Sequence, residues 1–70
     1  MRVLLRNSQT GLLYAGGDHW TREYSEAFEF EAVAPAIDCA AAMNLTGAEV
    51  VMWFSDSGFE IPLKLVGRGE

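Results

Sequence analysis

The chain has 70 residues, a net charge of −5 and a hydrophobic share of 50%. This length allows one domain (residues 1–70), and the eight aromatic side chains are too many for a disordered chain. Because the five basic residues are scattered, the charge argues against nucleic acid or an anionic membrane surface as a partner. No stretch approaches the ~20 apolar residues of a membrane-spanning helix, and we expect a soluble protein that begins at its own Met1.

Two short apolar runs open the chain, at residues 3–6 and 12–15. The five residues between them, 7–11, favour turns, so the spacing predicts a β-hairpin. The hairpin is expected to end at the Gly16-Gly17-Asp18 breaker.

The next segment, residues 19–27, has no clear apolar face and is predicted to be irregular, with Trp20 as an anchor. Residues 28–31 then alternate between Phe and Glu, which is typical of a half-buried strand. The pattern places Phe28 and Phe30 inward.

A helical period follows over residues 33–44. Pro35 suits the first helical turn, where its missing N–H costs nothing. Asn44 can take the left-handed conformation that commonly ends a helix. The apolar face that this period predicts consists of Val33, Ala36, Ala40 and Met43.

The last two predicted strands are residues 49–55 and 59–66, joined by the turn Asp56-Ser57-Gly58. Phe59, Ile61, Leu63 and Leu65 share one face of the second strand. Pro62 cannot donate to a ladder, so this strand either lies at an edge or turns that position away from its partner. Residues 67–70 are expected to form a loose tail.

The resulting order, β-β-β-α-β-β, predicts an α+β fold: an antiparallel sheet of four to five strands packed on one α-helix (residues 33–44). In this fold Val50, Met52 and Phe54 face the helix, which leaves Val51 and Trp53 on the outer face. Leu4, Leu13 and Pro62 are expected to point the same way.

This outer face suggests a partner, because an apolar patch of that size with a Trp is unusual on a monomer. The interface candidates are Trp53, Val51, Leu4, Leu13 and Pro62. We expect a non-enzymatic protein-interaction or assembly module, either a homodimer formed through this face or a module that binds another protein.

A second interpretation has segment 16–27 fold over Trp53, with Trp20 or Tyr24 covering it. A pocket between that segment and the sheet would then make the chain a small-ligand-binding protein, with His19, Trp20 and Tyr24 at the rim.

Catalytic and metal sites are not predicted, and neither is a cofactor. His19 is the only histidine, so it lacks further metal ligands. Cys39 is the only cysteine, which excludes an internal disulfide and favours a reducing, cytoplasmic setting. The acidic stretch with Glu26, Glu29 and Glu31 is interpreted as outward-facing strand residues that keep the strand in solution.

The layout resembles that of small uncharacterised bacterial proteins with an N-terminal hairpin, an aromatic segment before an Ala-rich helix, and a C-terminal hairpin. The residues that carry the resemblance are Trp20, Phe28, Phe30, Ala36-Ile37, Ala40 and the stretch 50–65. The resemblance implies this fold and a bacterial setting, and it brings no activity or functional residues.

Overall fold

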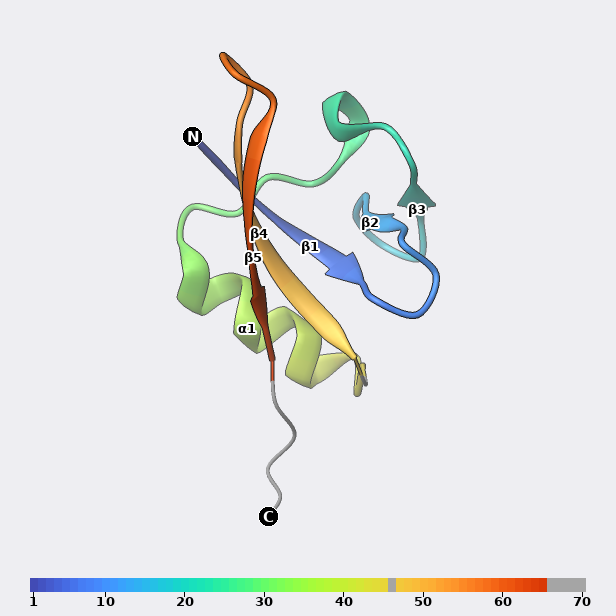
Figure 1. Cartoon of the computed structure of the whole chain (residues 1–70). Helices are drawn as coiled ribbons and strands as arrows, with labels where there is room; N and C mark the ends of the chain where they lie inside the picture. Colours follow the sequence, from blue (N-terminus) through green and yellow to red (C-terminus); the bar gives the residue numbers. More distant parts are fainter. Residues whose placement is uncertain (46, 66–70) are drawn as a thin grey trace.

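The computed structural model describes residues 1–45 and 47–65 (Figure 1). Its five strands form one antiparallel sheet in the order β3-β2-β1-β4-β5, and the helix lies on one face, as the α+β prediction required. The predicted tail, residues 67–70, and Val66 lie outside the described residues. In chain order the elements are β1 (Arg2–Asn7), β2 (Leu13–Tyr14), β3 (Trp20–Thr21), the short 3-10 helix η1 (Tyr24–Glu26), α1 (Val33–Ala42), β4 (Ala48–Phe54) and β5 (Phe59–Lys64).

The centre of the sheet is the pair β1 and β4. All six residues of β1 have a partner in β4, from Arg2 opposite Trp53 to Asn7 opposite Ala48. On the other side of β4, β5 pairs along its whole length after a turn in which Gly58 takes a φ of 71°. Glycine adopts this positive φ without steric cost. Strand β5 pairs with β4 alone and is therefore an edge strand.

Helix α1 is two residues shorter at its C-terminus than predicted, but it ends as expected. Asn44 has a φ of 55°, and the Leu45 N–H donates to the Ala40 carbonyl at 3.1 Å. Ala36 and Ala40 are buried against the sheet, because small side chains allow the helix axis to approach it closely.

The predicted strand at residues 28–31 is wrong, and the third strand is instead β3. Only Phe30 forms a bridge, donating its N–H to the Val3 carbonyl at 2.8 Å. Strand β2 pairs only with the end of β1, so the first half of that edge is available to this segment. The chain crosses the edge at Phe30 instead of running along it, and Phe28 is 45% exposed rather than inward.

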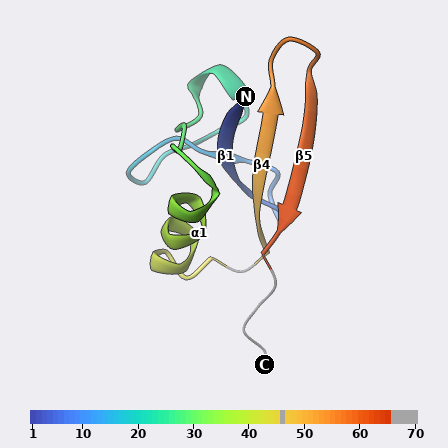
Figure 2. The same ribbon diagram turned by 90° about the vertical axis from the view of Figure 1, so that its left-hand side faces the viewer.

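The sheet separates two cores, because alternate residues of β1 and β4 point to opposite faces. The core under α1 is built around Val3, Leu5 and Val50, and Phe30 also packs there. Figure 2 shows α1 beside β1 and β4, with β5 on the far side of β4 from the helix. The second core, on the outer face, consists of Leu4, Leu13, Ala27 and Val51.

Candidate interaction surfaces

The outer face of β1 and β4 is covered by the chain itself, whereas Pro62, on the outer side of β5, is exposed. Residues 22–27, which we call the strap, run over it and include η1. Leu4, Leu13 and Val51 are at most 2% exposed, so the prediction that these three form an interface is wrong. The Tyr24 ring packs on Trp53 with centroids 4.7 Å apart. The contact of Tyr24 with Trp53 is the one that the second interpretation described.

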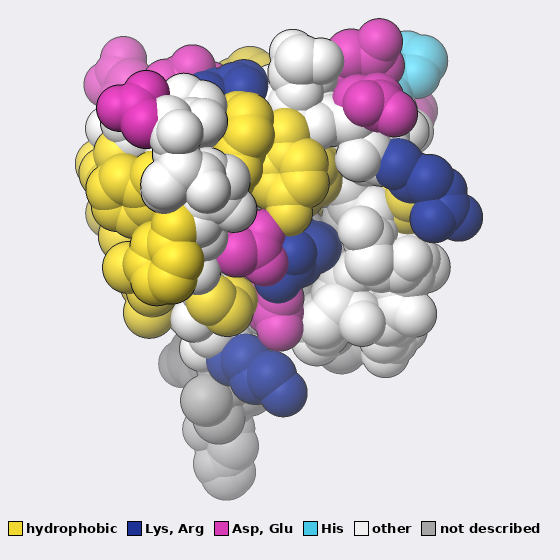
Figure 3. Space-filling view, turned by 45° about the horizontal axis from the view of Figure 1, so that its top comes forward, with side chains coloured by type: hydrophobic (Ala, Val, Ile, Leu, Met, Phe, Trp, Pro, Cys, Tyr) yellow, Lys and Arg dark blue, Asp and Glu magenta, His cyan; other side chains and the backbone are white. Residues whose placement is uncertain are grey.

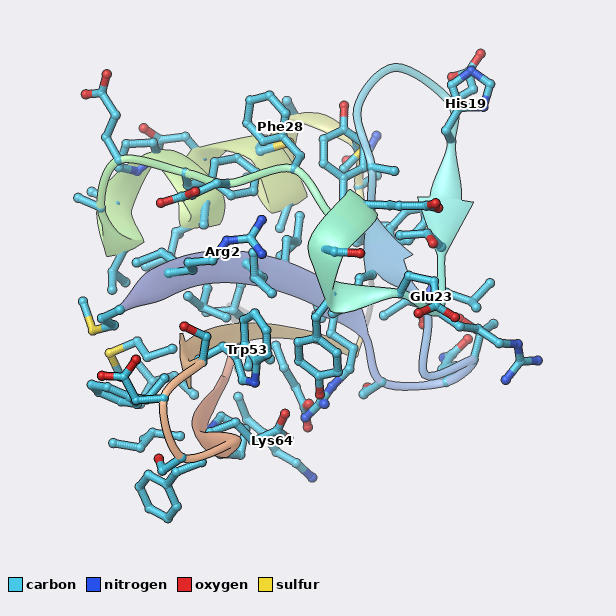
Figure 4. The ribbon with its side chains drawn as sticks, turned by 90° about the horizontal axis from the view of Figure 1, so that it is seen from above. Arg2, His19, Glu23, Phe28, Trp53 and Lys64 are labelled. Atoms are coloured by element: carbon cyan, nitrogen blue, oxygen red, sulfur yellow. The ribbon has the colours of Figure 1, made fainter. Side chains whose placement is uncertain are left out.

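Arg2 holds the strap in place from β1. Its guanidinium donates to the carbonyls of Tyr24 at 2.9 Å and Ala27 at 3.2 Å, and it pairs with Glu29 at 3.3 Å. The same group lies 5.6 Å from the centre of the Trp53 ring, within the range of a cation–π contact. Figure 4 shows these two side chains next to each other. One arginine therefore joins the strap to the two central strands.

A second polar group fastens the strap to the edge strand. The Tyr24 hydroxyl donates to Glu60, which also accepts from Arg6 at 3.0 Å. Arg6 donates to Glu49 as well, at 2.8 and 3.0 Å. The four side chains come from β1, the strap, β4 and β5, so they join segments that lie far apart in the sequence.

These contacts shift the pKa values of Glu60, Tyr24 and Arg6. The hydrogen bond from Tyr24 lowers the pKa of Glu60, partial burial opposes this, and Arg6 lowers it further. The hydrogen bond to Glu60 raises the pKa of Tyr24, with burial adding to the effect. Burial disfavours the charged form of Arg6, but the hydrogen bonds to Glu49 and Glu60 outweigh it and raise its pKa. The arrangement is a satisfied set of hydrogen bonds, and its role is to hold the strap.

The proposed ligand-rim residues do not surround a common site. His19 is exposed in the turn before β3 and points away from Trp53 (Figure 4). Trp20 packs edge-on against Tyr14 at 5.5 Å, whereas Tyr24 packs on Trp53. Nothing in these contacts favours the pocket that the sequence suggested.

Three exposed large apolar side chains lie together on the helix side of β5, and among the described residues Met1, Phe28 and Ile37 are exposed elsewhere. Phe59 is 59% exposed, Ile61 38% and Leu63 39%, and we call these three residues the β5 stripe. They pair with Phe54, Met52 and Val50 of β4 and therefore share the face that carries α1. Figure 3 shows hydrophobic side chains gathered on the side of the molecule that the β4–β5 hairpin forms.

The stripe is open because α1 is narrow. A helix with its side chains is about 10–12 Å across, and strands lie about 4.8 Å apart, so one helix covers about two strands. Here it contacts β1 and β4. The alternation of apolar residues in β5 is visible in the sequence, but the width of the covering layer is not.

The outer edge of β5 carries Pro62. The Leu65 N–H donates to the Ala48 carbonyl at 3.0 Å, and alternation therefore turns the odd-numbered N–H groups of β5 toward β4. The backbone groups of Glu60, Pro62 and Lys64 face the free edge. Pro62 has no N–H to offer there, so both of the possibilities predicted for it hold.

Among residues 1–45 and 47–65, no three His, Cys, Asp or Glu side chains gather in a way that could hold a metal ion. Cys39 is half-buried on α1 and packs against the core under the helix. Among the same residues, no helix is long and apolar enough to cross a membrane.

The sequence reasoning missed the positioning residues Arg2, Arg6 and Glu60. The sequence gives little indication of this role, because a charged residue at a strand end is usually solvated. The pairing of β4 with both β1 and β5, which brings them together, is a long-range feature.

A scan against protein-family models finds no match, and neither the curated proteins nor the solved structures contain a significantly similar protein.

Proposed function

We propose that this chain is a non-enzymatic protein-interaction module that forms a homodimer, and that its contact surface is the β5 stripe. The observation that supports this proposal is the exposure of Phe59, Ile61 and Leu63 on one face of an edge strand. Contiguous apolar side chains of this kind are characteristic of association surfaces. The Trp53 face, which the sequence favoured, is occupied by the strap.

Size gives a second argument. A 70-residue domain buries only about 60–65% of the surface of its unfolded chain, so its core is small. Covering the stripe with another copy extends the helix-side core across β4 and β5. Symmetric dimers are the commonest oligomers, and they need only one self-complementary patch.

The test is the mass of the native protein by light scattering at micromolar concentration, compared between wild type and Ile61→Lys. We expect a wild-type dimer and a variant whose dissociation constant is raised at least about 100-fold, because the added charge would be buried without a partner. Thr10→Lys adds the same charge on an exposed loop between β1 and β2 and should remain dimeric.

The Trp53→Lys variant distinguishes an interface on the β5 stripe from one on the outer face. If the stripe is the interface, this variant loses stability through its contacts with Tyr24 and Arg2 but remains a dimer under native conditions. A folded Trp53→Lys monomer beside a dimeric Ile61→Lys variant would move the interface to the outer face. A wild-type monomer of 7.7 kDa would refute the proposal altogether.

A further inference from the structure

The strap is fastened at both ends to the same short strand. Before it, Thr21 of β3 pairs with Leu13 of β2. After it, the Phe28 N–H donates to the carbonyl of Tyr14, which is the other residue of β2, at 2.8 Å. We call these two attachments the pins. Because β2 holds both ends, the loop between them can move off the sheet without a change in the strands.

Between the pins, the backbone of the strap is not part of the sheet. Its two backbone–backbone hydrogen bonds run from Glu26 to Glu23 and from Ala27 to Tyr24, and no such bond joins residues 22–27 to another described segment. Ala27 is buried, Tyr24 is partly buried, and the other four strap residues are exposed. A segment with so little buried apolar surface opens more readily than the core beneath it.

Two side chains close the strap onto the sheet. Arg2 donates to two carbonyl groups of the strap, and Tyr24 packs on Trp53 and donates to Glu60. Arg2 is also held by its ion pair with Glu29, outside the strap, and by the Trp53 ring, so it keeps its place when the strap moves away. Reclosing costs little entropy, because the pins already hold the ends of the loop together.

We propose that the strap is a lid, which opens as a unit about the two pins while the sheet and α1 remain folded. Arg2 and Tyr24 are the latches that close it. Opening uncovers Leu4 and Val51, which are 0% exposed in the closed state, and the burial of these side chains favours closure. The lid lies on the outer face, so this inference does not depend on the proposed homodimer.

The first experiment compares a thiol beneath the strap with a thiol beneath the helix. Cys39→Ser removes the native thiol, and Val51→Cys or Val50→Cys then introduces a single new one. The two valines are neighbours in β4, are both 0% exposed, and belong to the cores on opposite faces. Urea unfolding of the two proteins shows whether their global stabilities match.

A disulfide reagent in solution reaches the Val51→Cys thiol whenever the lid opens, but reaches the Val50→Cys thiol only when the domain unfolds. We therefore expect Val51→Cys to react at least about 100-fold faster without denaturant. Its rate should be nearly independent of urea at low concentration, because lid opening exposes little surface, whereas the rate at Val50→Cys should rise steeply.

The second experiment tests the latches against the helix-side core. Tyr24→Phe keeps the ring but removes the hydrogen bond to Glu60, so it should accelerate the reaction at Val51→Cys about fivefold. Val3→Ala weakens the core under α1, which stays intact when the lid opens. It should accelerate Val50→Cys at least about tenfold and leave Val51→Cys unchanged. Arg22→Gln, at an exposed strap position, is the control and should change neither rate.

Hydrogen exchange of the wild-type protein tests the pins without a substitution. A single 3-10 turn is not stable without the sheet beneath it, so the Ala27 amide should exchange whenever the lid opens. The amide of the next residue, Phe28, is part of a pin and should remain protected until the domain unfolds.

Three results would overturn the proposal. Equal reaction rates at the two thiols, with the same urea dependence, mean that the outer face opens only by global unfolding. Acceleration of Val51→Cys by Val3→Ala, to the same extent as Val50→Cys, leads to the same conclusion. Exchange of the Phe28 amide as fast as that of Ala27 means that the pins do not hold and the strap is not the moving unit.

Discussion

The two faces of the sheet exchange the roles that the sequence suggested for them. The outer face, expected to be open, is sealed by the strap through Tyr24 and Arg2. The helix face, expected to be sealed, is open over β5. The difference shows that whether a face is covered depends on the width of what lies over it as well as on its hydrophobicity. The single helix contacts β1 and β4, and a short irregular segment covers the same two strands on the other side.

The largest expected effect comes from the sealed face. Leu4→Ala should lower the free energy of unfolding by about 3 kcal/mol, because it leaves a cavity beneath the strap. Ile61→Ala, on the open face, should cost less than about 1 kcal/mol in the monomer. Urea denaturation at a concentration well below the dimer dissociation constant provides the measurement. Equal losses would erase the distinction between the two faces.

The strap itself gives a smaller effect. Arg2→Ala should destabilise by about 2 kcal/mol, because the carbonyls of Tyr24 and Ala27 lose a charged donor. Hydrogen exchange at the Ala27 amide, which donates to Tyr24, should accelerate before global unfolding does. Arg2→Lys keeps the charge but lacks the forked donor, so it should recover only part of the loss. Arg22→Ala, at an exposed position of the strap, is the control, and an equal effect there would remove the special role of Arg2.

The smallest effect is on pH dependence. Because the folded-state pKa of Glu60 lies below its ordinary value of 4.5, the unfolded chain binds this proton more readily. The contribution of Glu60 to stability is therefore complete above pH 4.5 and is lost as the pH falls through the folded-state pKa.

Glu60→Gln should remove this part of the pH dependence and lower the free energy of unfolding by about 1 kcal/mol at pH 7. Denaturation curves between pH 3 and 7 test it, with the exposed Glu31→Gln as the control. The free energy of unfolding of Glu60→Gln should not keep the wild-type slope against pH on the acid side. If it does keep that slope, while the slope of Glu31→Gln becomes smaller, the Tyr24–Glu60 contact is not what fastens the strap.

Much of the fold could be predicted from local patterns. The opposite orientations of Val50 and Val51, the helical face with Ala36 and Ala40, and the ending at Asn44 all follow from period and residue type. Each depends on neighbours within a few residues. These are the features that sequence reasoning reaches most directly.

The strap and β3 could not be predicted in this way. Residues 22–27 have no period, and their position depends on Arg2 and Trp53, which come from opposite ends of the chain. Strand β3 has two residues, too few for a pattern, and its pairing with Tyr14 depends on the reversal at Gly16 and Gly17. The burial of Leu4, Leu13 and Val51 could not be predicted for the same reason, since it depends on the strap.

The pairing of Arg2 with Trp53 has a consequence for how this protein folds during its synthesis. During synthesis β1 is made before β4, so it finds its central partner only after the residues between them have been made. Until then the apolar side chains of Val3, Leu4 and Leu5 have no sheet to join. Contacts so distant along the chain make folding slow relative to a helical protein of this size. The nascent chain therefore has to remain unaggregated with its first strand uncovered, and the arginines at both ends of that strand, Arg2 and Arg6, are well placed to help.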